Sequence, residues 1–337
     1  MKGEKRGGIF LQLTAVEKLF HILDQSTLIL ENELNCTYLE ALVETGENLF
    51  QNRVLQQGID EFTAKKLEKF YSDADLSAME KEDIRKAFQL ACLKGMKRHV
   101  QPNHQMTPDS IGILLAYFIR KFVPDRAFSM LDPAAGTGNL LTTILNQLPD
   151  AEIRATGIEL DDLLVKLAYT GCNLQGHPVE FFNQDGLANL LVDPVDVVVC
   201  EPPVGYYTNG RQAEKFVLKA EEGHSFIHHL FIEQGCRYAK EGGYLFYVVP
   251  HHLFESKEAQ KLNAFIKEHM HMQGFLHLPD SLFMNKSLAK SVLILQKKKE
   301  GIRPPKEIFL MKLPSLSNKR ALAQIFAKFD QWMKENK

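Results

Sequence analysis

Apolar residues recur every three to four positions through the first hundred residues, which is the spacing of helices with one buried face. One such stripe contains Phe10, Leu13, Val16, Phe20 and Leu23, and a second runs from Tyr38 to Leu49. A third covers residues 81–97, and a shorter helical piece covers residues 63–71. Because such stripes mostly form a core, residues 1–100 are predicted to be a helical domain without chemistry of its own.

From residue 101 onward, short apolar runs alternate with amphipathic helical segments, which is typical of parallel β-α-β units. Thr107 is expected to cap a first helix, with Pro108 in its opening turn and a buried face from Ile111 to Phe122. Strands are predicted at residues 128–131, 153–158, 179–182, 195–200, 244–249, 272–278 and 291–296. Further helices are predicted at residues 139–148, 161–174, 225–239 and 257–269.

Two features of these elements indicate the architecture of the sheet. The runs Val197–Cys200 and Leu245–Val249 are almost continuously apolar, as expected for strands covered on both faces. The last two strands are joined without a long helix, so they are expected to pair antiparallel. An extra strand at residues 308–312 and a terminal helix at 318–336 follow. Residues 101–337 are therefore predicted to form an α/β domain with a seven-stranded, doubly wound, Rossmann-like sheet.

The composition is that of an ordinary globular chain, with 337 residues of which 45% are hydrophobic and 24% charged. A net charge of -2 gives no overall basic footprint for nucleic acid. No apolar run approaches the roughly 20 residues that a bilayer requires, and the charged N-terminus does not resemble a signal peptide. The five cysteines are scattered without a C-x-x-C pair, as in reduced proteins. A cytoplasmic location without a membrane partner is expected.

Candidate chemistry gathers in the loops that follow the predicted strands. The run F-S-M-L-D-P-A-A-G-T-G-N-L-L at 128–141 predicts a strand, a tight glycine loop and a helix, so a ligand can approach bare backbone at Gly136 and Gly138. Glu159 follows the next strand, where an acid can accept both hydroxyls of a ribose. Leu141 replaces the third glycine of the G-x-G-x-x-G fingerprint. The pattern therefore favours a ligand with a ribose but without a pyrophosphate.

The loops after the third and fourth strands carry further polar groups. Asp185 follows the third strand, where a side-chain oxygen could meet an adenine amino group. The fourth strand runs directly into E-P-P-V at Glu201–Val204, where two prolines force a rigid, extended turn. Such rigidity makes sense if backbone carbonyls must be aimed at a substrate.

These residues together resemble the S-adenosylmethionine-dependent N6-adenine DNA methyltransferases, and most closely the modification subunits of type I restriction systems. The resemblance covers about residues 101–299 and includes, in kind, the preceding helical domain. Thr107-Pro108 resembles the family's T-P element, D-P-A-A-G-T-G its methionine-binding loop, and L-P at 278–279 with Phe283 its late L-P-x-x-x-F segment. The resemblance implies the family's methyltransferase sheet, S-adenosylmethionine as cofactor, and these cofactor-binding residues: Thr107, Asp132, Ala134, Gly136, Gly138, Glu159 and Asp185.

The chain departs from the family at the catalytic turn, where N-P-P-F or N-P-P-Y is replaced by E-P-P-V. In the family, the asparagine oxygen and a carbonyl of the proline segment accept the two amine protons, and the aromatic residue stacks on the flipped base. Glu201 keeps an acceptor but adds a methylene and a charge, and displacements of ~1 Å can cost about a hundredfold in rate. Val204 removes a stacking partner worth roughly 1–3 kcal/mol. The implied catalytic residues are Glu201, Pro202, Pro203 and Tyr206, with Tyr207 as the alternative stacking partner.

The resemblance implies methyl transfer to an exocyclic amine, most plausibly N6 of adenine in DNA. Sequence recognition would come from a partner chain, because only about forty residues follow the last predicted sheet strand, too few for a sizeable reader. Homo-oligomers are compatible with the sequence. Lysines at 286, 290, 297, 298 and 299 could line a phosphate-binding rim, although solvated surface lysines are commoner.

Other functions remain open at this stage. The altered turn is compatible with a cofactor-binding protein that has lost catalysis and acts through partners. A methyltransferase for RNA or protein glutamine would use the same turn on another planar amide, whereas Leu141 argues against a nicotinamide dehydrogenase. His224 and His228 share one helical turn, but the glutamate of H-E-x-x-H and a third ligand are lacking, so no metal is expected.

Overall fold

The computed structural model describes residues 13–98, 106–283, 285 and 288–337. The chain divides into two compact units, Met1–Gln101 with Asn173–Gly176 and Pro102–Cys172 with His177–Lys337. The domain boundary expected at residue 100 falls outside the described residues and stays a prediction.

In the described part of the first unit, all of the regular secondary structure is helical. It contains α1 (Ala15–Leu34), α2 (Tyr38–Gln51), α3 (Glu61–Ser72), the 3-10 turn η1 (Leu76–Ala78) and α4 (Lys81–Arg98). Thr14 and Thr37 cap α1 and α2 in capping boxes with Glu17 and Glu40, which fixes where each helix begins. The helical N-terminal part predicted from the apolar stripes is therefore confirmed, although Phe10 of the first stripe lies outside the described residues.

The second unit is built on one eight-stranded sheet with the order β3-β2-β1-β4-β5-β7-β6-β8. Its strands are β1 (Ala127–Asp132), β2 (Glu152–Glu159), β3 (Val179–Asn183), β4 (Val195–Cys200), β5 (Ala239–Pro250), β6 (Met270–His277), β7 (Lys290–Lys297) and β8 (Phe309–Lys312). Strands β1 to β5 are parallel, and β7 lies antiparallel between β5 and β6, which confirms the pairing expected for the last two predicted strands. The eighth strand is the extra one expected at residues 308–312, and it pairs parallel to β6.

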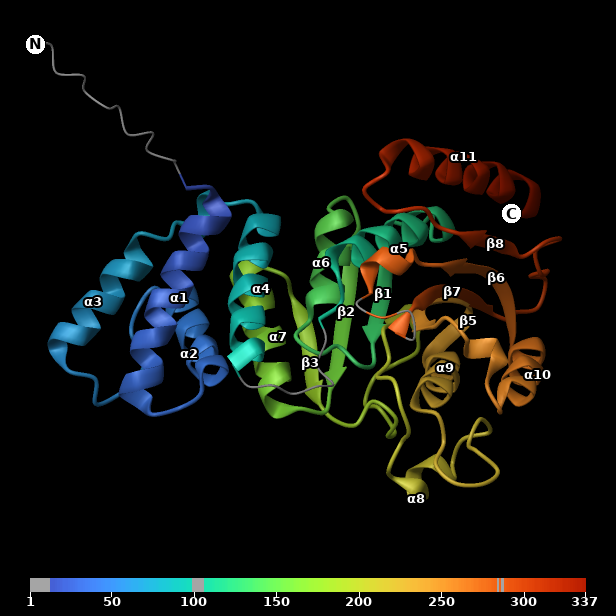
Figure 1. Cartoon of the computed structure of the whole chain (residues 1–337), viewed down its shortest axis with the longest axis horizontal. Helices are drawn as coiled ribbons and strands as arrows, with labels where there is room; N and C mark the ends of the chain where they lie inside the picture. The colour runs from blue at the N-terminus through green and yellow to red at the C-terminus, as the bar shows by residue number, and fades with distance from the viewer. Residues whose placement is uncertain (1–12, 99–105, 284, 286–287) are drawn as a thin grey trace, which may run out of the picture. The chain divides into compact units, whose positions relative to one another are not determined.

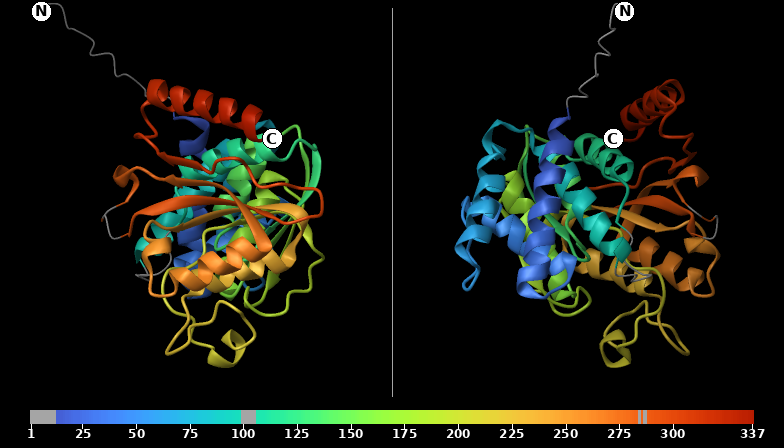
Figure 2. Two further views of the ribbon diagram at one scale, coloured as in Figure 1. Left: turned by 90° about the vertical axis from the view of Figure 1, so that its right-hand side faces the viewer. Right: turned by 60° about the vertical axis from the view of Figure 1, so that its left-hand side comes forward.

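Helices cover both faces of this sheet (Figure 1). One face packs against α5 (Asp109–Phe122), α6 (Asn139–Gln147) and α11 (Lys319–Asn336), and the other against α9 (Ile227–Tyr238) and α10 (Ala259–His269). In β4, Val197 and Val199 join the first core, whereas Val198 and Cys200 join the second. The alternation explains why the run is almost entirely apolar. Figure 2 shows the twisted sheet edge between α11 and α10.

Several helix starts differ from the sequence-based expectation, and for two of them the structure shows the local reason. Thr107 does not cap α5: Pro108 takes the N-cap position without a side-chain hydrogen bond, and the helix begins at Asp109. Helix α9 begins at Ile227 rather than at Ser225. Ser225 is held in the preceding segment because its carbonyl accepts the Tyr207 N–H at 2.9 Å and its hydroxyl accepts the Ala220 N–H at 3.0 Å.

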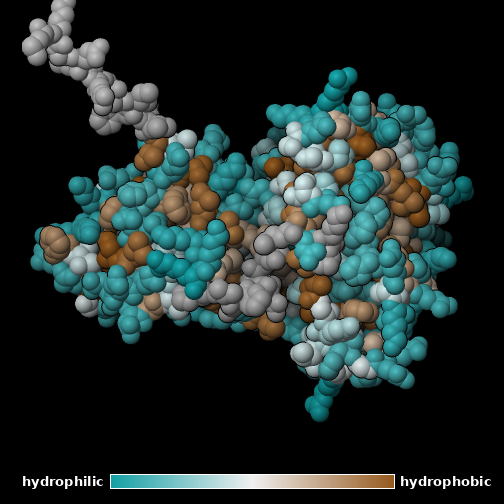
Figure 3. Space-filling view, in the orientation of Figure 1, coloured by the Kyte–Doolittle hydropathy of each residue, from teal (hydrophilic) through white to brown (hydrophobic). Residues whose placement is uncertain are grey.

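Three short elements follow strands of this sheet: α8 (Gly210–Ala213) after β4, and the 3-10 turns η2 (Leu253–Glu255) after β5 and η3 (Asp280–Leu282) after β6. Helix α7 (Asp162–Gln175) connects β2 to β3. Polar residues dominate the face shown in Figure 3, and the apolar residues on it form scattered patches. Throughout the described part of the chain, no helix combines the length and the apolar character needed to cross a bilayer.

Candidate active site at the carboxyl edge of the sheet

The order of the strands creates a point where two loops separate. Strand β1 lies between β2 and β4, and the chain passes from β1 to β2 and β3 before it returns to β4 on the other side. Open α/β sheets bind ligands outside the carboxyl ends of the strands at such a switch point. The loop Asp132–Gly138 and the turn that begins at Glu201 follow the two strands that meet there.

The loop after β1 has a backbone shape that favours glycine. Gly136 and Gly138 have φ angles of 56° and 74°, in the left-handed region. A Cβ atom on Gly136 would find nothing within 4 Å, so the loop faces open space at this residue. Asp132 Oδ1 accepts the Ala134 N–H at 3.1 Å, and α6 begins at Asn139 directly after the second glycine. The loop thus presents backbone beside a helix N-terminus, as predicted from the sequence.

Glu159 ends β2 and is hydrogen-bonded to the glycine loop. Its Oε2 atom accepts the Gly136 N–H at 2.8 Å, and its Oε1 atom accepts the Asp161 N–H at 2.9 Å. An ionised carboxylate has about four lone-pair positions, so two remain for the hydroxyls of a ligand. The structure therefore brings together the glycine loop and the acid that sequence reasoning assigned to one ligand.

Asp185 follows β3 in a loop that packs tightly on the loop after β1. A Cβ atom on Gly186 would lie 2.0 Å from the Pro133 carbonyl oxygen, so only glycine fits there. Asp185 Oδ1 accepts the Leu187 N–H at 2.9 Å, and Oδ2 accepts the Tyr207 hydroxyl at 2.5 Å. Tyr207 is therefore a buried partner of Asp185, and the sequence had offered it only as a stacking residue.

Negative charge is concentrated at this edge. Asp132 is only 1% exposed, and its burial raises the pKa of its carboxyl to about 7. The Ala134 N–H opposes this rise, whereas the nearby carboxylates of Glu159 and Glu201 add to it. The three acids are thus close enough to influence one another, and Glu159 together with ionised Asp132 would stabilise a cationic group at this edge.

Glu201 is held at both of its carboxylate oxygens. Oε1 accepts a hydrogen bond from the Lys290 ammonium at 2.5 Å, and Oε2 accepts one from the Thr107 hydroxyl. The Glu201 and Lys290 side chains are 13% and 16% exposed, so the ion pair is largely shielded from water. Thr107 is fixed in turn because its carbonyl accepts the Asn139 side-chain N–H at 2.9 Å. Thr107 therefore contacts the predicted catalytic residue instead of capping a helix.

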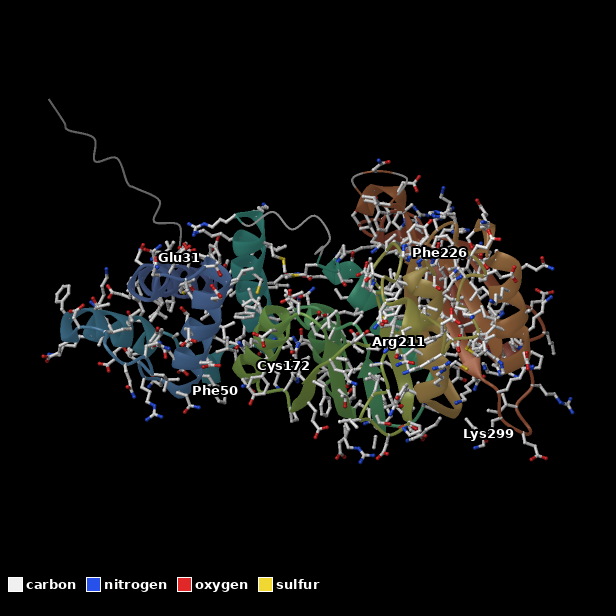
Figure 4. All side chains as sticks on the ribbon, turned by 90° about the horizontal axis from the view of Figure 1, so that it is seen from below. Glu31, Phe50, Cys172, Arg211, Phe226 and Lys299 are labelled. Carbon is white, nitrogen blue, oxygen red and sulfur yellow. The ribbon has the colours of Figure 1, made fainter. Side chains whose placement is uncertain are left out.

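The rest of the E-P-P-V turn leads into a long loop. Pro202 is buried, Pro203 is exposed and the Val204 side chain is 60% exposed. Tyr206, also 60% exposed, stacks on Phe226 with ring centroids 5.1 Å apart. Figure 4 labels Phe226 at the end of this loop and Arg211 in α8 within it. The exposed aromatic ring of Tyr206 therefore lies four residues after Pro202. In the family's N-P-P-F or N-P-P-Y turn, the aromatic residue lies only two residues after the first proline.

Lys290 is the contributor to this site that sequence reasoning did not identify. It was read with lysines 297–299 as a phosphate-binding rim, but Lys290 and Lys297 stand at opposite ends of β7. Lys297 and Lys298 donate to the carbonyls of Ala239 and Lys267. Lys290 and Lys297 therefore cannot share one rim, Lys286 lies outside the described residues, and phosphate binding by the remaining lysines stays a prediction. The only available signal was a charged residue at the start of an otherwise apolar strand.

The two histidines considered as metal ligands lie in different surroundings. His224 is exposed, whereas His228 is 5% exposed, and burial lowers the pKa of His228 to about 3. Within residues 13–98, 106–283, 285 and 288–337, no group of three or more His, Cys, Asp or Glu side chains is arranged to hold a metal ion.

Comparison with known proteins identifies the family. The sequence profile described as N-6 DNA Methylase matches residues 102–331, more than half of the chain. The chain belongs to this family of methyltransferases. A second profile, described as the YtxK N-terminal helical domain, matches residues 17–96 of the helical unit. The resemblance inferred from the sequence motifs is therefore confirmed.

Individual relatives agree with this assignment. The protein YtxK of Bacillus subtilis is 47% identical over 330 residues, which covers 97% of this chain and 100% of that protein. A Listeria monocytogenes protein assigned to the class I S-adenosylmethionine-dependent methyltransferases is 49% identical and superposes with a TM-score of 0.88, covering 95% of this chain and 99% of the other. The type I restriction-modification methyltransferase subunit of Streptococcus thermophilus is 18% identical with a TM-score of 0.64, covering 94% and 74%, and shares the fold.

Proposed function

We propose that this family member is an S-adenosylmethionine-dependent N-methyltransferase whose acceptor is an exocyclic amine, N6 of adenine in DNA. The observation that carries the proposal is the place of Glu201. It follows β4 at the switch point, beside the glycine loop, with its carboxylate fixed by Thr107 and Lys290. The acceptor-binding turn and the cofactor loop of an amine methyltransferase would need this arrangement.

The residues at this edge fit S-adenosylmethionine. Open space faces Gly136, and the carboxylates of Glu159 and Asp185 follow the next two strands outward, where ribose and adenine groups can be bound. Glu159, and Asp132 in its ionised form, would add negative charge that favours a cationic ligand. When bound, S-adenosylmethionine would supply a methyl group activated by its sulfonium. Thr107, Asp132, Ala134, Gly136, Gly138, Glu159 and Asp185 are the residues proposed to hold it.

The chain's own residues would orient the acceptor amine. Two lone-pair positions of the Glu201 carboxylate remain after Thr107 and Lys290 have donated, and one of them can accept an amine N–H. The Pro202 carbonyl would accept the second N–H, because the two prolines hold this backbone rigid. With both hydrogens held, the nitrogen lone pair points away from the turn. A strong base is unnecessary, because the nitrogen would gain a positive charge as it accepts the methyl group and could then lose a proton to the Glu201 carboxylate or to water.

DNA as the substrate is supported by the family and by the exposed ring of Tyr206, stacked on the half-buried Phe226, which offers a face for a flipped base. Structural relatives include subunits of type I restriction-modification systems. We therefore infer that a partner chain supplies sequence recognition.

Transfer of labelled methyl from S-adenosylmethionine to unmodified DNA tests this function directly. The wild-type chain is expected to label DNA in a form that DNase removes, and Glu201→Ala is expected to lose the signal. Label that RNase or protease removes instead would point to RNA or protein glutamine as the acceptor. Label transfer that is equal in Glu201→Ala would refute the role of this turn.

A second candidate is a cofactor-binding protein without catalysis, and the exposed Val204 in place of an aromatic residue favours it. The transfer assay separates the two: this candidate predicts that calorimetry detects binding of S-adenosylmethionine while no label is transferred to DNA, RNA or a lysate.

A further inference from the structure

Lys290 reaches Glu201 because of the way β7 is inserted into the sheet. Strand β7 runs antiparallel to β5, and Lys290 pairs with Pro250, the last residue of β5. The first residue of β7 therefore lies at the edge where the parallel strands end. Val292 and Ile294, which share its face, belong to the core under α5. Thr107 lies two residues before Asp109, where α5 begins, so the second partner of Glu201 precedes the helix that packs on this same core.

The ion pair changes the charge at the acceptor position. A glutamate without Lys290 would add an uncompensated carboxylate to an edge that already holds Asp132 and Glu159. Such a carboxylate, 13% exposed, would attract any ammonium group brought near it. Paired with Lys290 at 2.5 Å, Glu201 forms a unit with no net charge, as the asparagine amide of the family's turn does.

We propose that Lys290 is a positioning residue that neutralises Glu201 and so restricts the acceptor position to uncharged amines, such as those of a nucleobase. An ammonium group, such as a protonated lysine side chain, would gain little from the paired carboxylate and would meet the Lys290 charge. Thr107 and Lys290 also fix the longer glutamate side chain in one place. This inference rests on the proposed function, because it assumes that the cofactor's reactive end faces Glu201.

The test compares two ligands that differ in charge at the position of the transferred methyl group. S-adenosylhomocysteine is neutral there, whereas sinefungin carries an ammonium group on carbon at the same place. Calorimetry gives the ratio of the Kd of S-adenosylhomocysteine to that of sinefungin for the full-length chain. The readout is binding alone, so it does not require that the chain be active.

The variants are expected to move this ratio in opposite directions. Lys290→Met leaves Glu201 uncompensated and should raise the ratio by about tenfold, and Glu201→Gln leaves Lys290 uncompensated and should lower it by a similar factor. The double variant removes both charges and should return to the wild-type ratio, as should Lys290→Arg. A role in folding alone would not produce changes of opposite sign.

Each outcome bears on one statement. An unchanged ratio in Lys290→Met, or in Glu201→Gln if the first variant does not fold, would overturn the role of Lys290 while leaving the proposed function intact. Failure of the wild-type chain to bind either ligand would overturn the proposed function itself, and this inference with it.

Discussion

The two halves of the candidate site are held together by different kinds of interaction. On the cofactor side, Glu159 is bonded to Gly136 and Asp161, and Asp185 to Leu187, so local backbone groups fix most of the geometry. On the acceptor side, Glu201 is fixed by side chains 94 and 89 residues away in the sequence. A ligand loop can therefore be recognised in a short motif, whereas the chemistry of an acceptor turn depends on the whole sheet.

The largest expected effect is at the contact between the two cofactor loops. Gly186→Ala would place a Cβ atom 2.0 Å from the Pro133 carbonyl oxygen, and backbone cannot give way as a flexible side chain can. We expect the free energy of unfolding to fall by about 1–3 kcal/mol or more, together with a large loss of cofactor affinity. Urea denaturation and calorimetry with S-adenosylhomocysteine would measure both.

Gly210→Ala is the matched control, because a Cβ atom there meets nothing within 4 Å and the φ angle is not left-handed. If Gly186→Ala behaves like this control, the close contact between Gly186 and the Pro133 carbonyl is disproved.

The next effect concerns pH. The pKa of Asp132 is about 7 in the folded chain and 3.8 as a free group, so the folded state binds the proton more tightly. The contribution of Asp132 to stability should therefore fall as pH rises from about 4 to 7, by at most about 4 kcal/mol, while the buried His228 acts in the opposite direction over part of this range. The difference in unfolding free energy between the wild-type chain and Asp132→Asn should show this slope, which urea denaturation between pH 4 and 9 would measure. The exposed Asp193→Asn should leave the slope unchanged, and an equal slope in both variants would disprove the assignment.

A smaller effect is expected on the acceptor side. Tyr206→Ala removes the exposed ring that stacks on Phe226 and should weaken DNA binding by roughly 1–3 kcal/mol, with cofactor affinity unchanged. Fluorescence anisotropy with an adenine-containing duplex would measure the change. Tyr169→Ala, which removes an exposed tyrosine from α7, is the control. Equal affinities in the two variants would remove Tyr206 from the substrate site.

The last effect, of similar size, tests one of the hydrogen bonds that join the two halves. Tyr207→Phe removes the hydroxyl that donates to Asp185 and should cost about 1–3 kcal/mol of unfolding free energy. In a double-mutant cycle with Asp185→Asn, the two changes should be non-additive. Additive effects would show that the bond does not couple the halves.

Much of the fold could be predicted from the sequence because its signals are local. The apolar runs of β4 and β5 mark strands covered on both faces, and Gly136 and Gly138 mark the loop after β1. The cap of α5 could not be predicted, because a hydroxyl suited to an N-cap was taken by Glu201, a residue distant in sequence. Lys290 was misread for the same reason: its partner is determined by the insertion of β7 between β5 and β6.

The pairing of Glu201 with Lys290 also has a consequence for biosynthesis. A ribosome that has translated as far as Asp185 has already made every residue proposed to hold the nucleoside. The acceptor turn still lacks its counter-charge until the penultimate strand has emerged from the exit tunnel and inserted beside β5. The proposed acceptor position therefore becomes neutral only when the sheet is nearly complete.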